Sequence, residues 1–428
     1  MIRIYMKKYL PRIVDDILIR KLKGRGAVLI QGPKWCGKTT TAEQVSNSVI
    51  YMDEPDRKEQ NIQLADISPS LLLEGETPRL IDEWQIAPKL WDAVRFAVDH
   101  KEGKGHFILT GSSVPGDLSS TSHSGTGRFA WLTMRNMSLF ESKESSGEVS
   151  INDLFGGVDT ISGTNNLNIN DLAYLVCRGG WPDVLDLDKD IALESASDYL
   201  DGVINSDISR VDNIYRDPQK AKRIMRSYAR NQGSQIAFTE IAKDISNNEE
   251  GISDETVASY VKALKKIFVI EDMQAWKPNL RSKTSIRASD TRYFSDSAIA
   301  AAALGLGPND LINDLKTFGL LFETMCIRDL RVYADSLNGD VYHYRDRSGL
   351  ECDAVVHLRD GHYGLIEIKL GGDRLIEEAA KNLLKLESNI DIGKMYKPSF
   401  KMILTGIDKY AYRRADGIFV VPIGCLRN

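Results

Sequence analysis

Residues 32–39 read Gly-Pro-Lys-Trp-Cys-Gly-Lys-Thr, and they match the phosphate-binding pattern GxxxxGK[ST] at every fixed position. The apolar residues 27–30 come directly before this octapeptide and predict a buried parallel strand, while residues 40–45 after it are compatible with a helix. In such a strand–loop–helix unit, glycines let backbone N–H groups close around phosphates, and the helix N-terminus adds positive potential. The octapeptide therefore predicts a nucleotide-binding α/β fold.

Each position of the motif has an expected role. The Lys38 ammonium is expected to reach the β- and γ-phosphate oxygens, and the Thr39 hydroxyl is expected to bind Mg²⁺. Cys36 occupies a variable position, where we expect it to be chemically inert. The predicted nucleotide-contacting residues are Gly32, Pro33, Lys34, Trp35, Cys36, Gly37, Lys38, Thr39 and Thr40.

A second motif lies at residues 79–83, where an apolar strand ends in Asp82 and Glu83. Asp82 is predicted to hold Mg²⁺ with its water shell, and Glu83 to polarise the attacking water. The alternative is an ordinary surface carboxylate. The position of the motif, about one βα unit after the octapeptide, favours the catalytic interpretation and a Walker B strand.

Two further side chains are candidates for the same site. Thr110 ends the predicted strand 107–110 and could hold the attacking water as a sensor, although strand-end threonines are also common as turn caps. Arg128 is the last of the Ser-, Gly- and Thr-rich residues 111–128 and could act as an arginine finger on a neighbouring subunit. The alternative for Arg128 is a solvated arginine.

The composition narrows the class of protein. A chain of 428 residues is too long for one ordinary core, so two or three domains are expected. Its 42% hydrophobic and 27% charged residues are typical of a soluble globular protein, and no apolar run is long enough to span a bilayer. The five cysteines have no CxxC spacing, which favours a reducing compartment. With no signal-peptide core near Met1, a cytoplasmic location is predicted.

The chain is predicted to be an α/β multidomain protein with three regions. Short strands at 27–30, 49–52, 79–83 and 107–110 alternate with helices, which predicts a mostly parallel sheet in the first region. A helical region and then an α/β region with its own sheet follow. The Asn-, Gly- and Ser-rich residues 159–170 are interpreted as an insertion or linker. The predicted domains are residues 1–165, 166–310 and 311–428.

The middle region has the element order of a winged helix over residues 219–280. Predicted helices at 220–230, 238–244 and 253–266 lead into a strand-like apolar run at 267–270. Residues 215–292 carry 15 Lys and Arg against 10 Asp and Glu, a net charge of +5, whereas the whole chain carries −5. A basic helix and wing suit phosphate contacts, although a winged helix can also serve only protein packing. The basic residues concerned are Lys262, Lys265, Lys266, Arg281, Lys283 and Arg287.

A third group of polar residues lies near the C-terminus. Asp353 precedes a turn at residues 359–361, and Glu367 and Lys369 follow on the next strand, on the same face because side chains alternate. Asp353 and Glu367 could bind Mg²⁺ while Lys369 orients water, and Glu323 could add a ligand from a preceding helix. The alternative is an exposed Glu–Lys pair on a hairpin, but the neighbouring apolar residues make charges costly there.

With these blocks in place, the chain resembles a large prokaryotic family of AAA-type ATPases, in which an ATPase core is joined to a C-terminal region of unknown function. The resemblance covers nearly the whole chain, but residues 134–137 replace the family's usual Pro-containing turn. It implies a P-loop AAA-type ATPase core, a winged helix, and a restriction-endonuclease-like C-terminal domain of the PD-(D/E)XK kind. The matching blocks are residues 32–39, 80–84, 109–113, 127–128, 139–141, 178–182, 322–323, 344–346, 351–353 and 367–369.

The residues support three classes of function. The leading hypothesis is an Mg-ATP-binding ATPase or nucleotide switch that acts on DNA or on a DNA-bound partner. The second is an ATP-gated, metal-dependent DNA nuclease, for which the set Glu323, Asp353, Glu367 and Lys369 is the discriminating feature. The third is a non-catalytic regulator whose nucleotide state controls oligomerisation or a protein partner. ATP and Mg²⁺ are the expected cofactors, and no membrane partner is expected.

Overall fold

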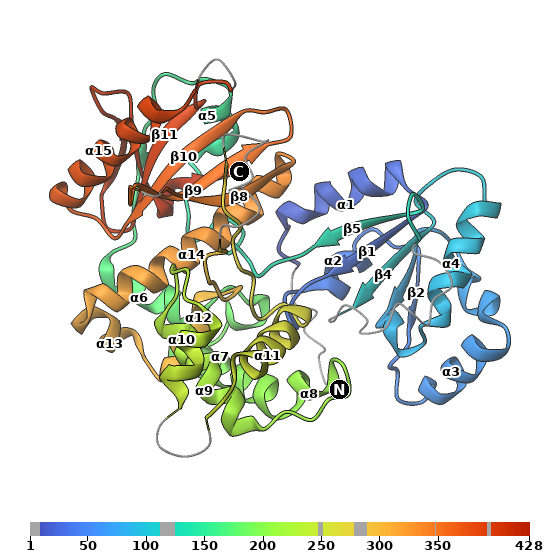
Figure 1. Cartoon of the computed structure of the whole chain (residues 1–428). Coiled ribbons are helices and arrows are strands. Elements are labelled where there is room, and N and C mark those ends of the chain that lie inside the picture. The colour runs from blue at the N-terminus through green and yellow to red at the C-terminus, as the bar shows by residue number, and fades with distance from the viewer. Residues whose placement is uncertain (1–8, 112–124, 247–250, 278–288, 347, 392–394) are drawn as a thin grey trace. The chain divides into compact units, whose positions relative to one another are not determined.

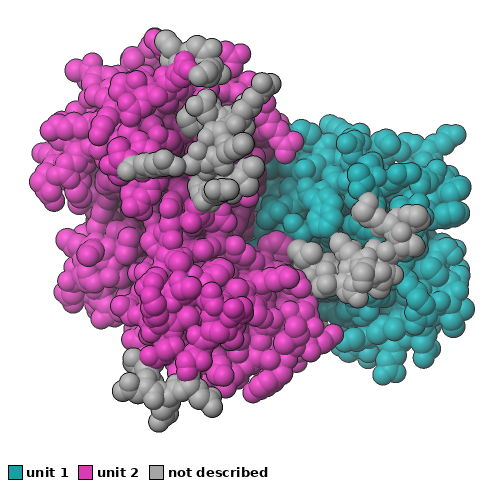
Figure 2. Space-filling view, viewed as in Figure 1, with its two compact units in different colours: residues 1–134 teal, residues 135–428 magenta. Residues whose placement is uncertain are grey.

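The computed structural model describes residues 9–111, 125–246, 251–277, 289–346, 348–391 and 395–428 (Figure 1). The chain divides into two compact units, residues 1–134 and 135–428 (Figure 2). The three domains expected from the sequence, with their bounds, stay a prediction. Within the described residues, no helix combines the length and the apolar content that crossing a bilayer requires.

The first unit is built on a five-stranded parallel sheet with the strand order β2-β3-β4-β1-β5. The central strand β1 pairs in parallel with both neighbours, so that Ala27 lies opposite Phe107 on one side and Phe129 on the other. The parallel sheet predicted from the buried apolar runs is confirmed, and β5 adds a strand that the sequence analysis did not predict. The strands are β1 (Ala27–Gln31), β2 (Ser48–Tyr51), β3 (Arg79–Asp82), β4 (Phe107–Gly111) and β5 (Phe129–Thr133).

Helices cover both faces of this sheet, because the side chains of each strand alternate between two apolar cores. Val28 and Ile30 of β1 pack in one core with residues of α1 and α2, whereas Ala27 and Leu29 pack in the other with residues of α3 and α4. The helices are α1 (Ile13–Gly24), α2 (Lys38–Glu43), α3 (Lys58–Ile67) and α4 (Lys89–His100).

The second unit contains a mixed seven-stranded sheet with the order β7-β12-β13-β11-β10-β9-β8. The hairpin predicted around residues 359–361 joins β9 to β10, which pair antiparallel, while β10, β11 and β13 run parallel. A small separate sheet joins β6 (Val149–Ser150) to β14 (Leu426–Arg427). The strands of the large sheet are β7 (Gly163–Thr164), β8 (Gly339–Arg345), β9 (Glu351–Leu358), β10 (Tyr363–Lys369), β11 (Phe400–Thr405), β12 (Tyr410–Arg413) and β13 (Phe419–Pro422).

Residues 159–170, expected to form an insertion or linker, are partly fixed to this sheet. Gly163 and Thr164 form the edge strand β7, which pairs with β12. The Asn165 side chain donates hydrogen bonds to the carbonyl oxygens of Gly406 and Asp408 at 2.9 and 3.0 Å. A polar composition therefore did not mean a free segment here, because the amide of Asn165 satisfies backbone groups of the adjoining turn.

Two long helices pack on the large sheet. α15 (Asp373–Asn389) buries Ile376, Ala380 and Leu383 in a core with β-strand residues such as Val355 and Leu365. α14 (Leu315–Ser336) packs against β8, β9 and β10 (Figure 1). The sheet is therefore covered by helices, and α14 carries residues that reach it from the helical region.

The helical region predicted between the first sheet and the C-terminal α/β region is present. At its centre lies α12 (Ser297–Leu304), the most apolar run of the sequence, which packs against α6, α7, α9 and α14. Its small alanine side chains allow this close packing on several sides. The other α-helices of the second unit are α5 (Ile151–Phe155), α6 (Ile169–Arg178), α7 (Lys189–Gly202), α8 (Ile208–Arg210), α9 (Pro218–Arg230), α10 (Phe238–Ile245), α11 (Asp254–Lys266) and α13 (Pro308–Asn313).

Candidate functional site

The octapeptide at residues 32–39 forms the turn between β1 and α2. A Cβ built on Gly32 would lie 2.0 Å from the carbonyl oxygen of Met134, closer than any side chain tolerates. Gly37, the N-cap of α2, has a φ of 98°. Residues that carry a side chain rarely adopt this left-handed backbone conformation. Both fixed glycines of the motif are therefore required by the backbone geometry of the loop.

Lys38 is buried and crosses this loop. Its ammonium donates hydrogen bonds to the carbonyl oxygens of Gly32 at 3.1 Å and Pro33 at 2.8 Å. The side chain thus runs from the last residues of the loop back to its first residues. A cation held by the loop in this way suits a phosphate ligand.

The other residues predicted to contact nucleotide differ in exposure. Cys36 is fully buried, and its thiol faces the carbonyl oxygen of Met134 at 3.6 Å. Trp35 is 57% exposed and has a φ of 65°. Lys34 and Thr40 are exposed as well. The loop therefore presents polar and aromatic side chains outward while its thiol is enclosed in the core.

Asp82 joins three elements of the first unit. At the end of β3, its Oδ1 accepts a hydrogen bond from the Thr39 hydroxyl of α2 at 2.7 Å and another from the Thr110 hydroxyl of β4 at 2.5 Å. Burial raises the pKa of Asp82, while the two hydroxyls act in the opposite direction. The structure thus brings together three side chains that the sequence analysis assigned to one site.

Glu83 directly follows this strand end. It has a left-handed backbone with a φ of 53° and a ψ of 42°, and the Gln85 side chain donates a hydrogen bond to its carboxylate. Burial raises its pKa first, and the neighbouring Asp82 charge adds to the rise. A non-glycine residue in this region of φ/ψ space is uncommon, and such residues cluster at functional sites.

Arg128 lies at the amino-terminal end of β5, whereas Asp82 and Glu83 lie at the carboxyl end of the parallel strand β3. It directly precedes β5, and its carbonyl oxygen accepts a hydrogen bond from the N–H of Ala27, the first residue of β1. The phosphate loop follows the last residue of the same strand. The Arg128 side chain forms an ion pair with Asp99 of α4 at 2.8 Å. The structure therefore does not bring Arg128 to the loop of its own chain.

The four C-terminal candidates lie on α14, β9 and β10 of the second unit. The Lys369 ammonium bridges the carboxylates of Asp353 at 2.8 Å and Glu367 at 2.7 Å. Asp353 also accepts a hydrogen bond from the Ile368 N–H at 2.7 Å. Glu323 lies on α14, and the Asp353 charge acts on it electrostatically. The pair of strands thus forms the three-residue arrangement that side-chain alternation predicts.

Burial perturbs this cluster strongly. It raises the pKa of Glu323 and of Glu367 to about 8 each, and the Asp353 charge adds to both shifts. Burial acts to lower the pKa of Lys369, but the two carboxylates together outweigh it and raise that pKa. Within the described parts of the chain, no three His, Cys, Asp or Glu side chains are arranged to hold a metal ion. In this arrangement Lys369 supplies the positive charge between the two strand carboxylates.

Two residues that the sequence analysis missed enclose Glu323. The Tyr293 hydroxyl donates a hydrogen bond to its carboxylate, and a Cβ built on Gly233 would lie 2.9 Å from the same oxygen. Both come from the region preceding α14, 30 and 90 residues away in the sequence. No local pattern could have indicated this contact, because it depends on tertiary packing.

The segment predicted as a winged helix contains its three helices, α9, α10 and α11. After α11 the chain forms antiparallel bridges between Ile270 and Phe294 and between Met273 and Thr291. Lys262 is exposed, whereas Lys265 forms an ion pair with Asp272 at 2.7 Å. The expected wing residues Arg281, Lys283 and Arg287 lie outside the described residues.

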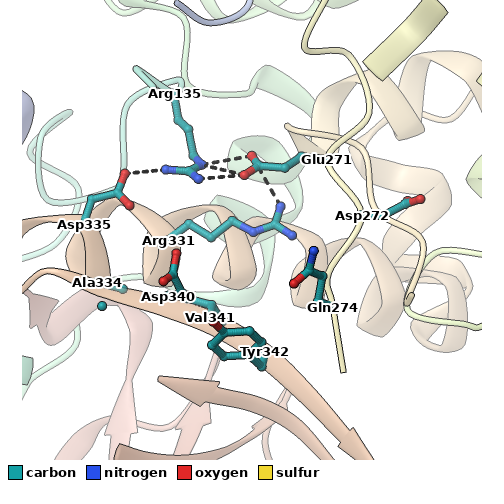
Figure 3. Close-up of a pocket in the computed structure, with 11 residues that line it drawn as sticks. Arg135, Glu271, Asp272, Gln274, Arg331, Ala334, Asp335, Asp340, Val341 and Tyr342 are labelled. Atoms are coloured by element: carbon teal, nitrogen blue, oxygen red, sulfur yellow. Dashed lines mark hydrogen bonds and ion pairs between the residues drawn. The ribbon is translucent and has the colours of Figure 1, made fainter. Parts of the chain in front are cut away.

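A charged pocket of about 360 Å³ lies in the second unit (Figure 3). The Arg135 guanidinium lies between Glu271, at 2.6 Å, and Asp335, at 2.5 Å. Arg331 forms a longer ion pair with Glu271 at 3.5 Å, and Asp340 also lines the pocket. The lining of the pocket includes residues from the start of the unit, from α14 and from the segment after α11. Its lining was not predicted, since its residues lie far apart in the sequence.

Three family models match successive parts of the chain. An AAA domain model matches residues 24–143, a domain of unknown function (DUF8612) matches residues 169–310, and another domain of unknown function (DUF4143) matches residues 318–426. The match over the five-stranded sheet shows an AAA domain, and by family it indicates an ATPase that binds ATP and Mg²⁺. The AAA-type core and the C-terminal regions of unknown function that the resemblance implied are thereby confirmed.

Two mycobacterial relatives and an archaeal solved structure are among the proteins similar to the chain. The uncharacterized proteins Mb2031c of Mycobacterium bovis and Rv2008c of Mycobacterium tuberculosis are each 23% identical over 372 residues, which is 86% of this chain and 75% of the relative. The Walker-type ATPase PABY2304 of Pyrococcus abyssi matches with a TM-score of 0.44 and 14% identity, over 69% of this chain and 96% of that one.

Proposed function

We propose that this chain binds Mg-ATP at residues 32–39 and hydrolyses it. The observation that carries the proposal is the meeting of the Thr39 and Thr110 hydroxyls at one oxygen of Asp82. A hydroxyl and a carboxylate oxygen side by side are hard ligands of the kind that Mg²⁺ prefers. The donor set therefore fits the ion that the AAA domain implies.

Each residue has one role in the proposed mechanism. Lys38 neutralises charge on the β- and γ-phosphates, and Thr39 and Asp82 would hold Mg²⁺, which would offset phosphate charge when bound. Glu83 accepts the proton of the attacking water, and its pKa, raised by burial, suits a general base. Thr110 fixes the Asp82 carboxylate, and its place at the strand end suits a sensor of that water.

Arg128 fits this mechanism only from a neighbouring copy of the chain. It lies at the sheet edge away from the phosphate loop of its own chain and is 46% exposed in its ion pair with Asp99. An arginine finger supplied by another subunit would stabilise charge in the transition state. The proposal therefore includes a homo-oligomer as the hydrolysing species.

We further propose that ATP hydrolysis acts on DNA or on a DNA-bound partner through a winged helix within residues 219–280. Support comes from three helices followed by antiparallel bridges, and from the exposed basic residues Lys222, Arg223 and Arg226 along α9 together with Lys262 on α11. Exposed basic side chains bind nucleic-acid phosphates without sequence preference. The proposal keeps the three domains predicted from the sequence, which are residues 1–165, 166–310 and 311–428.

Phosphate release measured with and without duplex DNA tests both parts. The wild type is expected to hydrolyse ATP only with Mg²⁺, and Lys38→Ala is expected to abolish nucleotide binding and turnover. DNA binding that weakens with rising salt supports the winged-helix part. Binding of ATP without turnover would instead favour a regulator controlled by nucleotide state, and equal turnover in the wild type and Lys38→Ala would remove the ATPase assignment.

A second function, metal-dependent cleavage of DNA, is favoured by the C-terminal cluster. Asp353, Glu367 and Lys369 meet on adjacent strands, and Glu323 lies on the helix before them, which is the residue set of the nuclease-like fold proposed for residues 311–428. Because no three His, Cys, Asp or Glu side chains of the described residues are arranged to hold a metal, this function requires Mg²⁺ to replace the Lys369 ammonium between Asp353 and Glu367, with Glu323 moving in as a further ligand. Lys369 would then orient the attacking water.

Supercoiled plasmid incubated with Mg²⁺ or Mn²⁺ tests the nuclease. Nicking by the wild type that Lys369→Ala abolishes is the expected result, and Lys385→Ala, an exposed lysine on α15, serves as the control. Nicking that survives in Lys369→Ala would place the activity elsewhere. Absence of nicking by the wild type with either metal would remove this second function and leave the ATPase proposal standing.

A further inference from the structure

A buried arginine outside the nucleotide motif contacts the phosphate-binding loop. Arg12, the residue before α1, is 7% exposed, and its Nη1 donates a hydrogen bond to the carbonyl oxygen of Cys36 at 2.8 Å. The two residues lie 24 positions apart in the sequence, so the motif gives no sign of this contact. A charged donor to a buried carbonyl is among the stronger hydrogen bonds in proteins.

The direction of this hydrogen bond determines where the next backbone N–H of the loop, that of Gly37, points. In the described part of the chain the cis peptide bond lies at Thr77–Pro78, so the bond between Cys36 and Gly37 is trans. In a trans peptide the carbonyl and the N–H point in opposite directions. Because Arg12 holds the Cys36 carbonyl on its own side, the Gly37 N–H points away from Arg12. Backbone N–H groups of this loop are the groups that cradle phosphates.

The segment that carries Arg12 is itself fixed at several points. The Arg12 N–H donates to Asp15 Oδ2 at 2.8 Å, and the Asp15 N–H donates to the Arg12 carbonyl at 3.0 Å. The Tyr9 hydroxyl donates to Asp15 Oδ1 at 2.6 Å and lies 3.0 Å from the Thr41 hydroxyl of α2. Since the Tyr9 proton is used by Asp15, Thr41 is the donor of the second bond. Residues 9–15 are thus attached both to the loop and to the helix after it.

We propose that Arg12 is a positioning residue of the nucleotide site, with Tyr9 as its second attachment point. The Arg12 side chain sets the orientation of the Gly37 N–H before nucleotide arrives, which lowers the cost of ordering the loop on binding. The inference rests on the proposed ATPase function. It assigns to Arg12 an effect on nucleotide affinity and none on the chemical step, because the guanidinium acts through the Cys36 carbonyl of the loop.

Steady-state ATP hydrolysis and binding of a fluorescent ATP analogue test the proposal. Arg12→Gln is expected to raise KM and the analogue's Kd by about tenfold or more, the cost of one buried charged hydrogen bond, while kcat stays within about twofold. Arg12→Lys keeps a charged donor and is expected to recover part of the affinity. Lys23→Gln, an exposed change on α1, is the matched control and should behave as the wild type.

The division between KM and kcat separates positioning from a general loss of structure. A partly unfolded variant has fewer active molecules, which lowers apparent kcat and leaves KM unchanged. If Arg12→Gln does not fold, Tyr9→Phe tests the same attachment and is expected to raise KM by about threefold. An unchanged KM in the folded variants overturns the inference. A wild type that neither binds nor hydrolyses ATP overturns the proposed function first, and the inference falls with it.

Discussion

The Thr39 hydroxyl donates a hydrogen bond to Asp82 Oδ1 at 2.7 Å, across 43 residues of sequence. One residue belongs to the start of the helix after the phosphate loop and the other to the end of the strand β3. Because β1 and β3 are parallel strands of one sheet, their carboxyl ends lie at the same edge, where α/β folds bind ligands. The relationship turns two separate sequence motifs into a single site.

Asp82→Asn is expected to remove the Mg²⁺ dependence of nucleotide binding. An amide is a weaker ligand for a hard cation than a carboxylate, and it keeps the size of the side chain. Titration of a fluorescent ATP analogue with Mg²⁺ and with EDTA measures the effect. The wild type should bind more tightly with Mg²⁺, whereas the variant should bind equally in both buffers. Retained Mg²⁺ dependence in the variant would contradict the assignment.

Glu83→Gln is expected to bind ATP normally and to hydrolyse it about 10²–10⁴ times more slowly, the usual contribution of a positioned general base. Single-turnover hydrolysis separates this loss from slow product release. Gln85→Ala is a useful companion, since Gln85 donates to the Glu83 carboxylate and is expected to affect turnover less than loss of the base itself. A Glu83→Gln variant with wild-type turnover would assign the base to another residue.

Gly32→Ala is expected to lower the stability of the first unit by about 1–3 kcal/mol, because its Cβ would collide with the Met134 backbone oxygen. Thermal unfolding measures the change. Gly24→Ala is the matched control: Gly24 ends α1, and nothing lies within 4 Å of its added Cβ. Equal melting temperatures for the two variants would mean that the backbone at Met134, just after β5, shifts without loss of stability.

Arg135→Gln is expected to destabilise the second unit by about 1–3 kcal/mol, because it leaves Glu271 and Asp335 without their shared partner. Urea unfolding followed by tryptophan fluorescence measures the change. The control is Arg345→Gln, which breaks the exposed pair with Glu351 and should cost about 0–1 kcal/mol. A smaller loss for Arg135→Gln than for the control would mean that Arg331 is a sufficient partner for Glu271 and that Asp335 tolerates the loss of its own.

The stability of the second unit is expected to fall as the pH rises toward 8. Burial raises the pKa of Glu323 to about 8 from an ordinary value of 4.5, so the folded state holds a proton that the unfolded state has lost. This contribution is complete below about pH 4.5 and is lost as the pH passes 8. Urea unfolding at several pH values measures it. Glu323→Gln, which cannot ionise, should reduce the pH dependence, and an unchanged slope would contradict the raised pKa.

The sequence by itself determined the features that depend on local pattern. Fixed glycines and a lysine at set spacing predicted a glycine-bearing loop between a strand and a helix, which the structure has at residues 32–39. Apolar runs of strand length predicted the parallel sheet, because parallel strands are buried on both faces. The hairpin before Glu367 also followed from local pattern. In these places the physical cause lies within a few residues of its effect.

Only the tertiary structure decided which distant residues meet. Arg12 reaches the Cys36 carbonyl, Tyr293 reaches Glu323, and Arg135 joins Glu271 to Asp335, and none of these contacts has a sequence signature. Residues 159–170 looked like a linker and yet supply an edge strand. Such contacts depend on how helices and sheets pack, and a buried charge or hydroxyl finds its partner wherever that packing brings one, at any separation along the chain.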